Sequence, residues 1–447
     1  MDLPRPDSDP PAPSRRGPLL GGGRFVIAAR RLVTCDLSRA SAGDPLGVIE
    51  DAALVVRDGA IEAVGRRQEI LRPGSGLEVA IDAAGVVTPG LVDCHTHAPW
   101  VGSRDAEYAV RMAGGDYEAI AAAGGGIVAS MRAVRAATAG ELAAALRARL
   151  RRMAELGVTA VEAKSGYGLD EASERKQLEA IADAGGDARL PRVVPTYLAL
   201  HALPPEARGD RAAYAGVVAR SWLPAIAAAG LARYVDAYID RSAFSVDEAR
   251  PVLERARALG LGVRVHVGQF ADVGGAALAA ALGAASADHL EHVAPEGIEA
   301  LAGAGVAAAL LPVASFTLRQ DPPPVDALRA AGVPLIVGSD ANPGTAPTES
   351  LPLALALAVR LYGLTVAEVI LGATREAARA LGLGDVCGAV RPGLRADLAI
   401  WDLPHENAIV QPWGTPRAET VLRDGEIIAA APWLRRGAAS SEESISG

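Results

Sequence analysis

Short apolar runs alternate with helix-like segments between Pro89 and Gly384, and this alternation constrains the fold more than any other feature of the sequence. Eight runs have the length and composition of buried strands, and each is followed by a segment rich in Ala, Leu, Arg and Glu. Eight alternating units predict an α/β fold, a TIM-like (β/α)8 barrel. The eight runs are GLVDCHTH, VTAVEAKSGYG, RVVPTYLALHA, YVDAYID, VRVHVGQF, ASADHLEH, VAAALLPVA and VPLIVGSDAN.

The alternative arrangement of such units is a doubly wound open sheet. That fold usually carries a glycine-rich phosphate loop after its first strand. We find neither a G-x-G-x-x-G sequence opening a helix after the first strand nor a G-K-[ST] loop, so the barrel is favoured.

Two β-rich regions flank the predicted barrel. Asp58-Gly59 and Asp424-Gly425 each separate two β runs, a strong signal for a two-residue hairpin. We expect the two regions to pack together as one small β-sandwich. The predicted organisation is a disordered leader (1–23), a first sandwich part (24–87), the barrel (88–385), a second sandwich part (386–435) and a disordered tail (436–447).

Charge and composition exclude several classes of partner. The net charge is −9 with no Lys/Arg-rich run, which argues against nucleic acid binding. No apolar run reaches the ~18 residues of a membrane span, and the N-terminus lacks the apolar core of a secretion signal. The three cysteines are widely spaced, as in proteins of a reducing compartment. These features predict a soluble cytoplasmic protein that acts on a small molecule.

Histidines gather at the ends of the predicted strands. In a strand, residues two apart project to the same face, so His95 and His97 would aim at one point. His266 and Asp340 end two later strands, and three imidazoles with one carboxylate suit zinc or iron and leave room for a water. An isolated strand-end histidine is usually structural, but this combination favours a metal site. Six of the seven histidines lie at strand ends: His95, His97, His201, His266, His289 and His292.

The segment PGLVDCHTH resembles the first-strand signature of the amidohydrolase superfamily, and longer stretches resemble the imidazolonepropionase family within it. Enzymes of that family hydrolyse 4-imidazolone-5-propanoate to N-formimidoyl-L-glutamate in histidine degradation. The resemblance implies a metal-bearing barrel with a composite β domain, one zinc or iron ion per chain, and a homodimer. The matching stretches are HTHAPWVGSRDAEYAVRMAGGDYEAIAAAGGGI, AKSGYGLD, LALHALPPE, AFSVDEAR, SADHLEH and SDANPGTAPTESLPLA.

The same resemblance implies roles for individual residues. His289 would lie beside the reacting carbonyl and, with the metal, stabilise the oxyanion. Asp340 would accept a proton from a metal-bound water and return it to the ring nitrogen after the hydroxide attacks the ring carbonyl. The implied metal ligands are His95, His97, His266 and Asp340. The implied substrate contacts are Arg104, Tyr167, His201, Asn342, Gly344 and Thr345.

Two of these contacts have a clear physical basis. The guanidinium of Arg104 can form two parallel charge-assisted bonds to the propionate carboxylate, which a lysine cannot reproduce. Gly344 lets the backbone come close to a ligand.

The chain departs from the family pattern at Gln269, where many members carry a glutamate. An amide can hold a ring nitrogen of the substrate but cannot transfer a proton. We therefore expect Gln269 to contact the substrate and Asp340 to act as the base.

Three other polar residues have competing interpretations. Lys164 could carry a carbamate that bridges two metals, but a structural role is favoured because the residue lies in an early strand. His292 is expected near a helix start rather than at the metal, and His405 on the surface.

Two rival functions are compatible with such a barrel. A nucleobase deaminase would not need Arg104. An inactive barrel scaffold would usually have lost one of the metal ligands, whereas this chain has the complete set.

Overall fold

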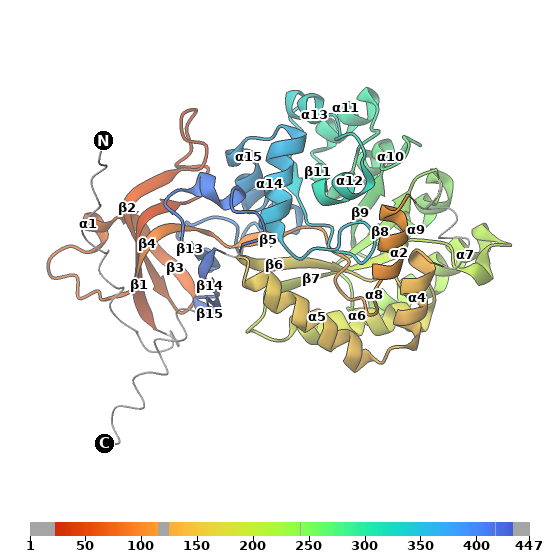
Figure 1. The fold of residues 1–447 in the computed structure, drawn as a ribbon, viewed down its shortest axis with the longest axis horizontal. Coiled ribbons are helices and arrows are strands. Elements are labelled where there is room, and N and C mark those ends of the chain that lie inside the picture. The colour runs from red at the N-terminus through yellow and green to blue at the C-terminus, as the bar shows by residue number, and fades with distance from the viewer. Residues whose placement is uncertain (1–22, 115–124, 242, 416, 432–447) are drawn as a thin grey trace, which may run out of the picture.

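The computed structural model describes residues 23–114, 125–241, 243–415 and 417–431. It contains a parallel barrel beside a separate mixed sheet (Figure 1), which confirms the predicted α/β class. The predicted tail, and all of the predicted leader except Gly23, lie outside the described residues. The residue limits of the domains stay predictions. Within the described ranges, no helix combines the length and the apolar character that crossing a membrane requires.

The barrel strands follow one another in sequence order, and all are parallel. Each predicted apolar run overlaps one of them. The strands are β5 (Leu91–Asp93), β6 (Val158–Lys164), β7 (Arg192–Leu200), β8 (Tyr234–Ile239), β9 (Gly262–Val267), β10 (Ser286–His289), β11 (Ala307–Leu310) and β12 (Leu335–Val337).

The segments that follow β5 and β12 close the barrel. Thr96 forms an isolated parallel bridge with Ala341. The His97 amide donates to the carbonyl of Ala341, and the Asp340 amide donates to the carbonyl of His95, both at 3.0 Å. Backbone hydrogen bonds therefore hold three of the four predicted ligands in register with one another.

Helices surround the barrel and cover its apolar strands (Figure 1). In α5, Leu142, Leu146 and Leu150 are fully buried, as their four-residue spacing predicts. Capping boxes start α5, α9 and α15. The helices are α2 (Asp105–Met112), α4 (Ile127–Ala136), α5 (Ala139–Ala154), α6 (Glu171–Gly185), α7 (Arg211–Val217), α8 (Leu223–Ala228), α9 (Val246–Ala258), α10 (Gly275–Leu282), α11 (Pro295–Ala304), α12 (Pro312–Leu318), α13 (Val325–Ala330), α14 (Leu351–Tyr362), α15 (Val366–Gly372) and α16 (Arg375–Ala380). Outside the barrel, α1 (Arg67–Ile70) packs next to the mixed sheet, and the 3-10 turn η3 (Glu406–Val410) lies in the C-terminal part of the chain.

The mixed sheet combines strands from both ends of the chain, red-orange and blue in Figure 1. The N-terminal strand β4 pairs with the C-terminal strand β13, which joins the two halves. The sheet order is β15-β14-β13-β4-β1-β2-β3. Its strands are β1 (Arg24–Val33), β2 (Val48–Arg57), β3 (Ala60–Arg66), β4 (Val79–Pro89), β13 (Leu398–Trp401), β14 (Ala418–Arg423) and β15 (Glu426–Ala430).

The expected sandwich takes the form of one continuous sheet rather than two separate ones. Ile27, Leu54 and Leu398 share one buried cluster although they lie on three different strands of that sheet. Both predicted hairpins are present. Asp58 and Gly59 have φ of 50° and 75°, and Asp424 and Gly425 have φ of 52° and 78°, the positive values that a type I′ turn requires.

Candidate metal centre and active site

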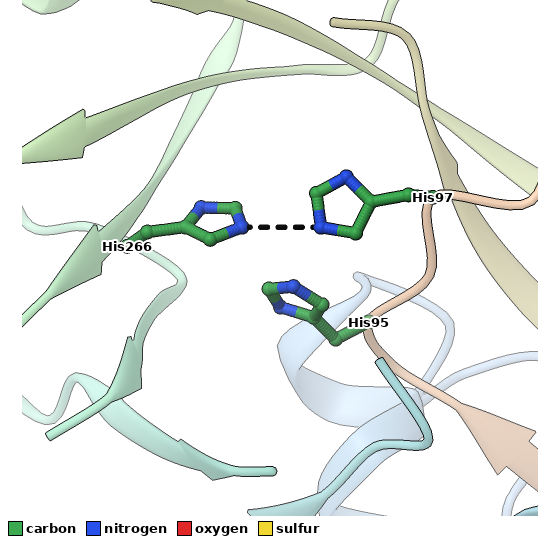
Figure 2. Close-up of side chains that lie close together, drawn as sticks. All are labelled: His95, His97 and His266. Atoms are coloured by element: carbon green, nitrogen blue, oxygen red, sulfur yellow. Dashed lines mark hydrogen bonds between the residues drawn. The ribbon is translucent and has the colours of Figure 1, made fainter. Parts of the chain in front are cut away.

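The four predicted metal ligands converge at the carboxyl ends of the barrel strands. Figure 2 shows the rings of His95, His97 and His266 facing one another. Nε2 of His97 lies 3.4 Å from Nε2 of His266, and Oδ1 of Asp340 lies 3.5 Å from Nε2 of His95 and 3.4 Å from Nε2 of His97. All four side chains are buried. The spacing of the strands therefore brings three imidazole nitrogens and one carboxylate oxygen to a single point.

This donor set fits a metal ion. Nε2 of His95 is buried and has no hydrogen-bond partner among the described residues, as expected for a nitrogen that binds a cation. Donors that each bond one ion tetrahedrally at about 2.0–2.2 Å stand about 3.4 Å apart, close to the separations observed. Burial, together with the nearby charge of Lys164, lowers the pKa of His95 well below its usual value, which keeps the ring neutral and able to bind a metal.

A buried carboxylate lies behind each of two ligand histidines. Asp288 Oδ2 is 2.6 Å from Nδ1 of His95, and Asp236 Oδ1 is 3.0 Å from Nδ1 of His266. Each carboxylate accepts a hydrogen bond from the Nδ1–H group and thereby directs Nε2 of the ring toward the predicted metal position. Although burial opposes ionisation, His266 and Lys164 hold the pKa of Asp236 below its usual range.

Lys164 connects these two carboxylates. Its ammonium lies 2.8 Å from Asp236, 2.8 Å from Glu162 and 3.8 Å from Asp288, and all four side chains are fully buried. Burial alone would lower the pKa of Lys164, but Asp236 and Glu162 raise it, so the side chain stays a charged ammonium. A carbamate forms from a neutral amine, so this arrangement favours the structural role over the bridging one.

Sequence reasoning missed Asp236, Asp288, Glu162 and Arg264, which fill the barrel interior with paired charges. The signal was present: each of these four polar residues interrupts a run that otherwise has the composition of a buried strand. A buried charge is costly unless it is paired. Several such charges in neighbouring strands therefore indicate a network.

His289, the last residue of β10, lies next to two of the predicted metal ligands. Its ring centroid is 5.6 Å from that of His266 and 6.1 Å from that of His95. Both His289 and Asp340 have left-handed backbone, with φ of 80° and 54°. Non-glycine residues seldom adopt this conformation, and such strain is concentrated at functional sites.

The rings of His201 and Tyr167 lie beside that of His97. The His201 ring stacks on His97 with a centroid distance of 5.2 Å, and Tyr167 lies beside both rings. Nδ1 of His201 is 2.7 Å from the carbonyl of Gly166 and donates to it, which leaves Nε2 as an acceptor. Burial lowers the pKa of His201 well below its usual value, so the ring is neutral.

Glu174 holds the loop that carries Tyr167. Its buried carboxylate accepts from the backbone amides of Gly166, Gly168 and Leu169 at 2.7–2.8 Å. The sequence carries no signal for this role, because acidic residues such as Glu174 are common in the first turn of a helix.

Arg104 and Gly344 approach each other closely. A Cβ atom added to Gly344 would lie 2.4 Å from Nη1 of Arg104. Nε of Arg104 donates a hydrogen bond to Glu107 at 2.9 Å, which helps to orient the guanidinium. With the guanidinium of Arg104 in this position, a side chain at 344 would have to displace it.

Asn342 lies next to this loop, but its amide is already engaged. Nδ2 donates to the carbonyl of Asp340 and to Oγ1 of Thr345, at 2.7 and 3.0 Å. Oδ1 accepts from the amides of Gly344 and Thr345, at 2.8 and 2.7 Å. This geometry favours a role in shaping residues 340–345 over the direct substrate contact expected for Asn342, and that contact stays a prediction.

Gln269 is buried near the metal ligands and is oriented by Tyr238. The Tyr238 hydroxyl donates to Oε1 of Gln269 at 2.7 Å, and the Tyr238 ring lies 5.8 Å from that of His266. With its oxygen occupied, the amide presents its NH₂ group as the donor for a ligand. Nothing in the sequence near Tyr238 predicts this contact.

The remaining histidines lie apart from the metal ligands. His292 is exposed, and its backbone amide donates to Gly268. The side chain of His405 is 45% exposed at the start of η3, and Nδ1 accepts from the amide of Asn407. Neither ring belongs to the cluster of potential metal ligands.

The profile of the Amidohydrolase family matches residues 86–429. An imidazolonepropionase from Acidiphilium cryptum is 50% identical over 375 residues, covering 83% of this chain and 91% of that protein. An imidazolonepropionase from a Polaromonas species is 46% identical over 385 residues, covering 86% and 90%. The chain belongs to the imidazolonepropionase family. The resemblance noted in the sequence is thereby confirmed, and the protein is a hydrolase acting on a cyclic amide.

Solved structures extend the likeness in fold beyond this family. An adenosine deaminase from Xanthomonas campestris superposes with a TM-score of 0.65 over 94% of this chain and 98% of that one, at 18% identity. At this identity the likeness concerns the fold alone.

Proposed function

We propose that this protein hydrolyses 4-imidazolone-5-propanoate to N-formimidoyl-L-glutamate, as members of the imidazolonepropionase family do. The observation that carries the proposal is identity of 45–50% with curated imidazolonepropionases over more than four fifths of the chain. The convergent donor set supports the same conclusion, as does the position of Arg104 next to Gly344, four residues beyond Asp340 in the chain. The reaction adds water across the bond between the ring carbonyl carbon and a ring nitrogen, which opens the ring.

His95, His97, His266 and Asp340 would hold one transition metal ion, zinc or iron. When bound, such an ion would lower the pKa of a water molecule and polarise the ring carbonyl. Asp236 and Asp288 contribute by fixing the tautomers of two ligand histidines. The homodimer implied by the family resemblance stays a prediction.

Asp340 and His289 would carry the proton and charge changes at the reacting carbon. Oδ1 of Asp340 makes the closest contacts with His95 and His97, which leaves Oδ2 to accept a proton from the attacking water. Asp340 then returns that proton to the ring nitrogen as the C–N bond breaks. His289 would stabilise the negative charge that develops on the carbonyl oxygen.

The other side chains would bind and orient the substrate. Arg104 would receive the propionate, and Gln269 would donate its NH₂ group to an acceptor on the ring. Neutral His201 would offer Nε2 as an acceptor to a ring N–H, while Tyr167 and Thr345 would bound the ring.

A direct assay tests the function. Purified, metal-supplied protein should open 4-imidazolone-5-propanoate, followed by loss of the imidazolone absorbance and by detection of N-formimidoyl-L-glutamate. Rapid deamination of a nucleobase without any imidazolone hydrolysis would contradict the proposal. Absence of both activities from a metal-replete protein would favour an inactive scaffold.

Arg104→Met should lower kcat/KM for 4-imidazolone-5-propanoate by about 10- to 100-fold, because a charge-assisted hydrogen bond is worth about 1.5–3 kcal/mol. The same variant should hydrolyse an imidazolone that lacks the propionate about as fast as the wild type. Measuring both substrates with both proteins checks the assignment. Equal losses on the two compounds would mean that Arg104 is structural.

Gly344→Ala offers an independent test of how Arg104 is placed. The new methyl group would collide with Nη1 of Arg104, so the guanidinium must move. We expect KM for the propionate-bearing substrate to rise about 10-fold, within the range for losing one charged contact. An unchanged KM would show that the position of Arg104 does not matter for binding.

A further inference from the structure

Two buried polar atoms face each other just beyond the metal ligands. Nδ1 of His289 lies 3.8 Å from Oε2 of Glu291. Neither atom has a hydrogen-bond partner among the described residues. Buried polar atoms are nearly always satisfied, so two orphaned atoms at this distance point to each other as partners.

The other oxygen of Glu291 is firmly anchored. Ser315, on α12, donates its hydroxyl to Oε1 of Glu291 at 2.6 Å. The Ser315 hydroxyl is also 2.5 Å from that of Tyr362, on α14. All three side chains are buried. Two helices therefore hold one end of the carboxylate, while the other end faces His289.

The backbone brings the two side chains together. His289 and Leu290 both have left-handed backbone, with φ of 80° and 71°. These two strained residues turn the chain sharply at the end of β10, which places the side chain of Glu291 beside the ring of His289. Strain at two consecutive non-glycine residues costs free energy and persists only where the surroundings demand it.

We propose that Glu291 is a positioning residue. It accepts a hydrogen bond from the Nδ1–H group of His289 and thereby directs Nε2 of that ring at the reacting carbonyl. The inference rests on the proposed function, in which His289 stabilises the oxyanion. In this arrangement the hydroxyls of Ser315 and Tyr362 hold the carboxylate of Glu291 in place. Hydrogen bonds of this kind often lengthen without substrate and shorten in the reacting complex.

The electrostatics agree with this geometry. Burial alone would lower the pKa of His289, but the neighbouring carboxylate of Glu291 raises it. Asp236 and Asp288 stand behind His266 and His95 in the same manner, so a carboxylate supports each of these three rings of the site.

Glu291→Gln should lower kcat by about 10- to 100-fold, the usual effect of losing a carboxylate behind a functional histidine, with KM changed less than about threefold. The metal content should stay at the wild-type level, measured by elemental analysis, because Glu291 does not contact a metal ligand. This pattern separates a role at the reacting carbonyl from a role in binding or in metal retention.

A double-mutant cycle with His289→Asn provides the decisive readout. If Glu291 acts through His289, adding Glu291→Gln to His289→Asn should change the rate by less than about twofold. Single-turnover experiments with excess enzyme make these slow rates measurable. If the second substitution again costs tenfold or more, or if Glu291→Gln alone keeps kcat within threefold of wild type, the proposal is overturned.

Glu406→Gln is the matched control. Glu406 is another buried carboxylate, 3% exposed, which accepts two hydrogen bonds from Arg31 next to the mixed sheet. This change should lower the melting temperature but leave kcat within twofold of wild type. An equal loss of kcat in both variants would mean that the effect of Glu291 is general destabilisation, and would overturn the proposal.

Ser315→Ala replaces Glu291→Gln in the cycle if the latter does not fold. It removes the donor to Oε1 while leaving the carboxylate, and it should reduce kcat in the wild-type background but not beside His289→Asn. Independent losses in the two backgrounds would overturn the proposal. A wild-type protein that does not open the imidazolone ring would instead overturn the proposed function, and this inference with it.

Discussion

Asp340→Asn should lower kcat by about 10²–10⁴-fold while the protein stays folded and metal-loaded. The factor is the usual contribution of general acid–base catalysis, which an amide cannot supply. Asparagine keeps the size of the side chain and an oxygen that can reach His95 and His97. It also tolerates the left-handed backbone at this position, where φ is 54°. The measurement is kcat on protein whose metal content has been determined.

Gln269→Glu is the informative companion to this variant. It places a carboxylate near the predicted metal ligands. In the wild type, the amide oxygen of Gln269 at this position accepts a hydrogen bond from the Tyr238 hydroxyl. If metal-replete Asp340→Asn keeps near-native kcat, the base lies elsewhere. Recovery of activity in Asp340→Asn with Gln269→Glu would show that position 269 can take over the proton transfer.

Removing two imidazoles should abolish metal retention. We expect one transition metal ion per chain in the purified wild type, and less than about a tenth of that in the double variant His95→Ala, His97→Ala, because half of the donor set is lost. Elemental analysis after dialysis against a weak chelator measures this directly. Turnover should disappear together with the metal.

His292→Ala is the matched control for this experiment. His292 lies on the same edge of the barrel, but its side chain is exposed and outside the donor cluster. It should keep both metal and activity. Two ions per chain in the wild type, or full retention in the double variant, would contradict the single-ion assignment.

Much of this architecture could be predicted from the sequence, because the deciding signals are local. A buried strand of a parallel barrel is a short apolar run, and all eight were visible as such. His95 and His97 belong to one segment, so their shared direction follows from strand geometry alone. The two Asp-Gly turns likewise specify their hairpins without help from the rest of the chain.

The parts that sequence reasoning missed depend on contacts between distant segments. Lys164 meets Asp236 across 72 positions, and Glu291 meets Ser315 across 24. Nothing in either neighbourhood specifies the partner. Asn342 illustrates the opposite difficulty: its type and position suit a ligand, but the structure engages its amide within its own loop. The sequence also did not predict that the two chain ends share one continuous sheet, because the pairing of β4 with β13 joins residues far apart in the chain.

The bridge between Thr96 and Ala341 bears on how the protein is made in the cell. The ribosome adds about 5–20 residues per second, and roughly 240 residues separate His97 from Asp340. The imidazoles of His95 and His97 are therefore synthesised tens of seconds before the carboxylate of Asp340. During synthesis the two imidazoles form, at most, a weak site from which a bound metal ion dissociates readily. Only when the last strand docks against the first does the chain acquire a tight site, so metal selection belongs to the finished protein rather than to the nascent one.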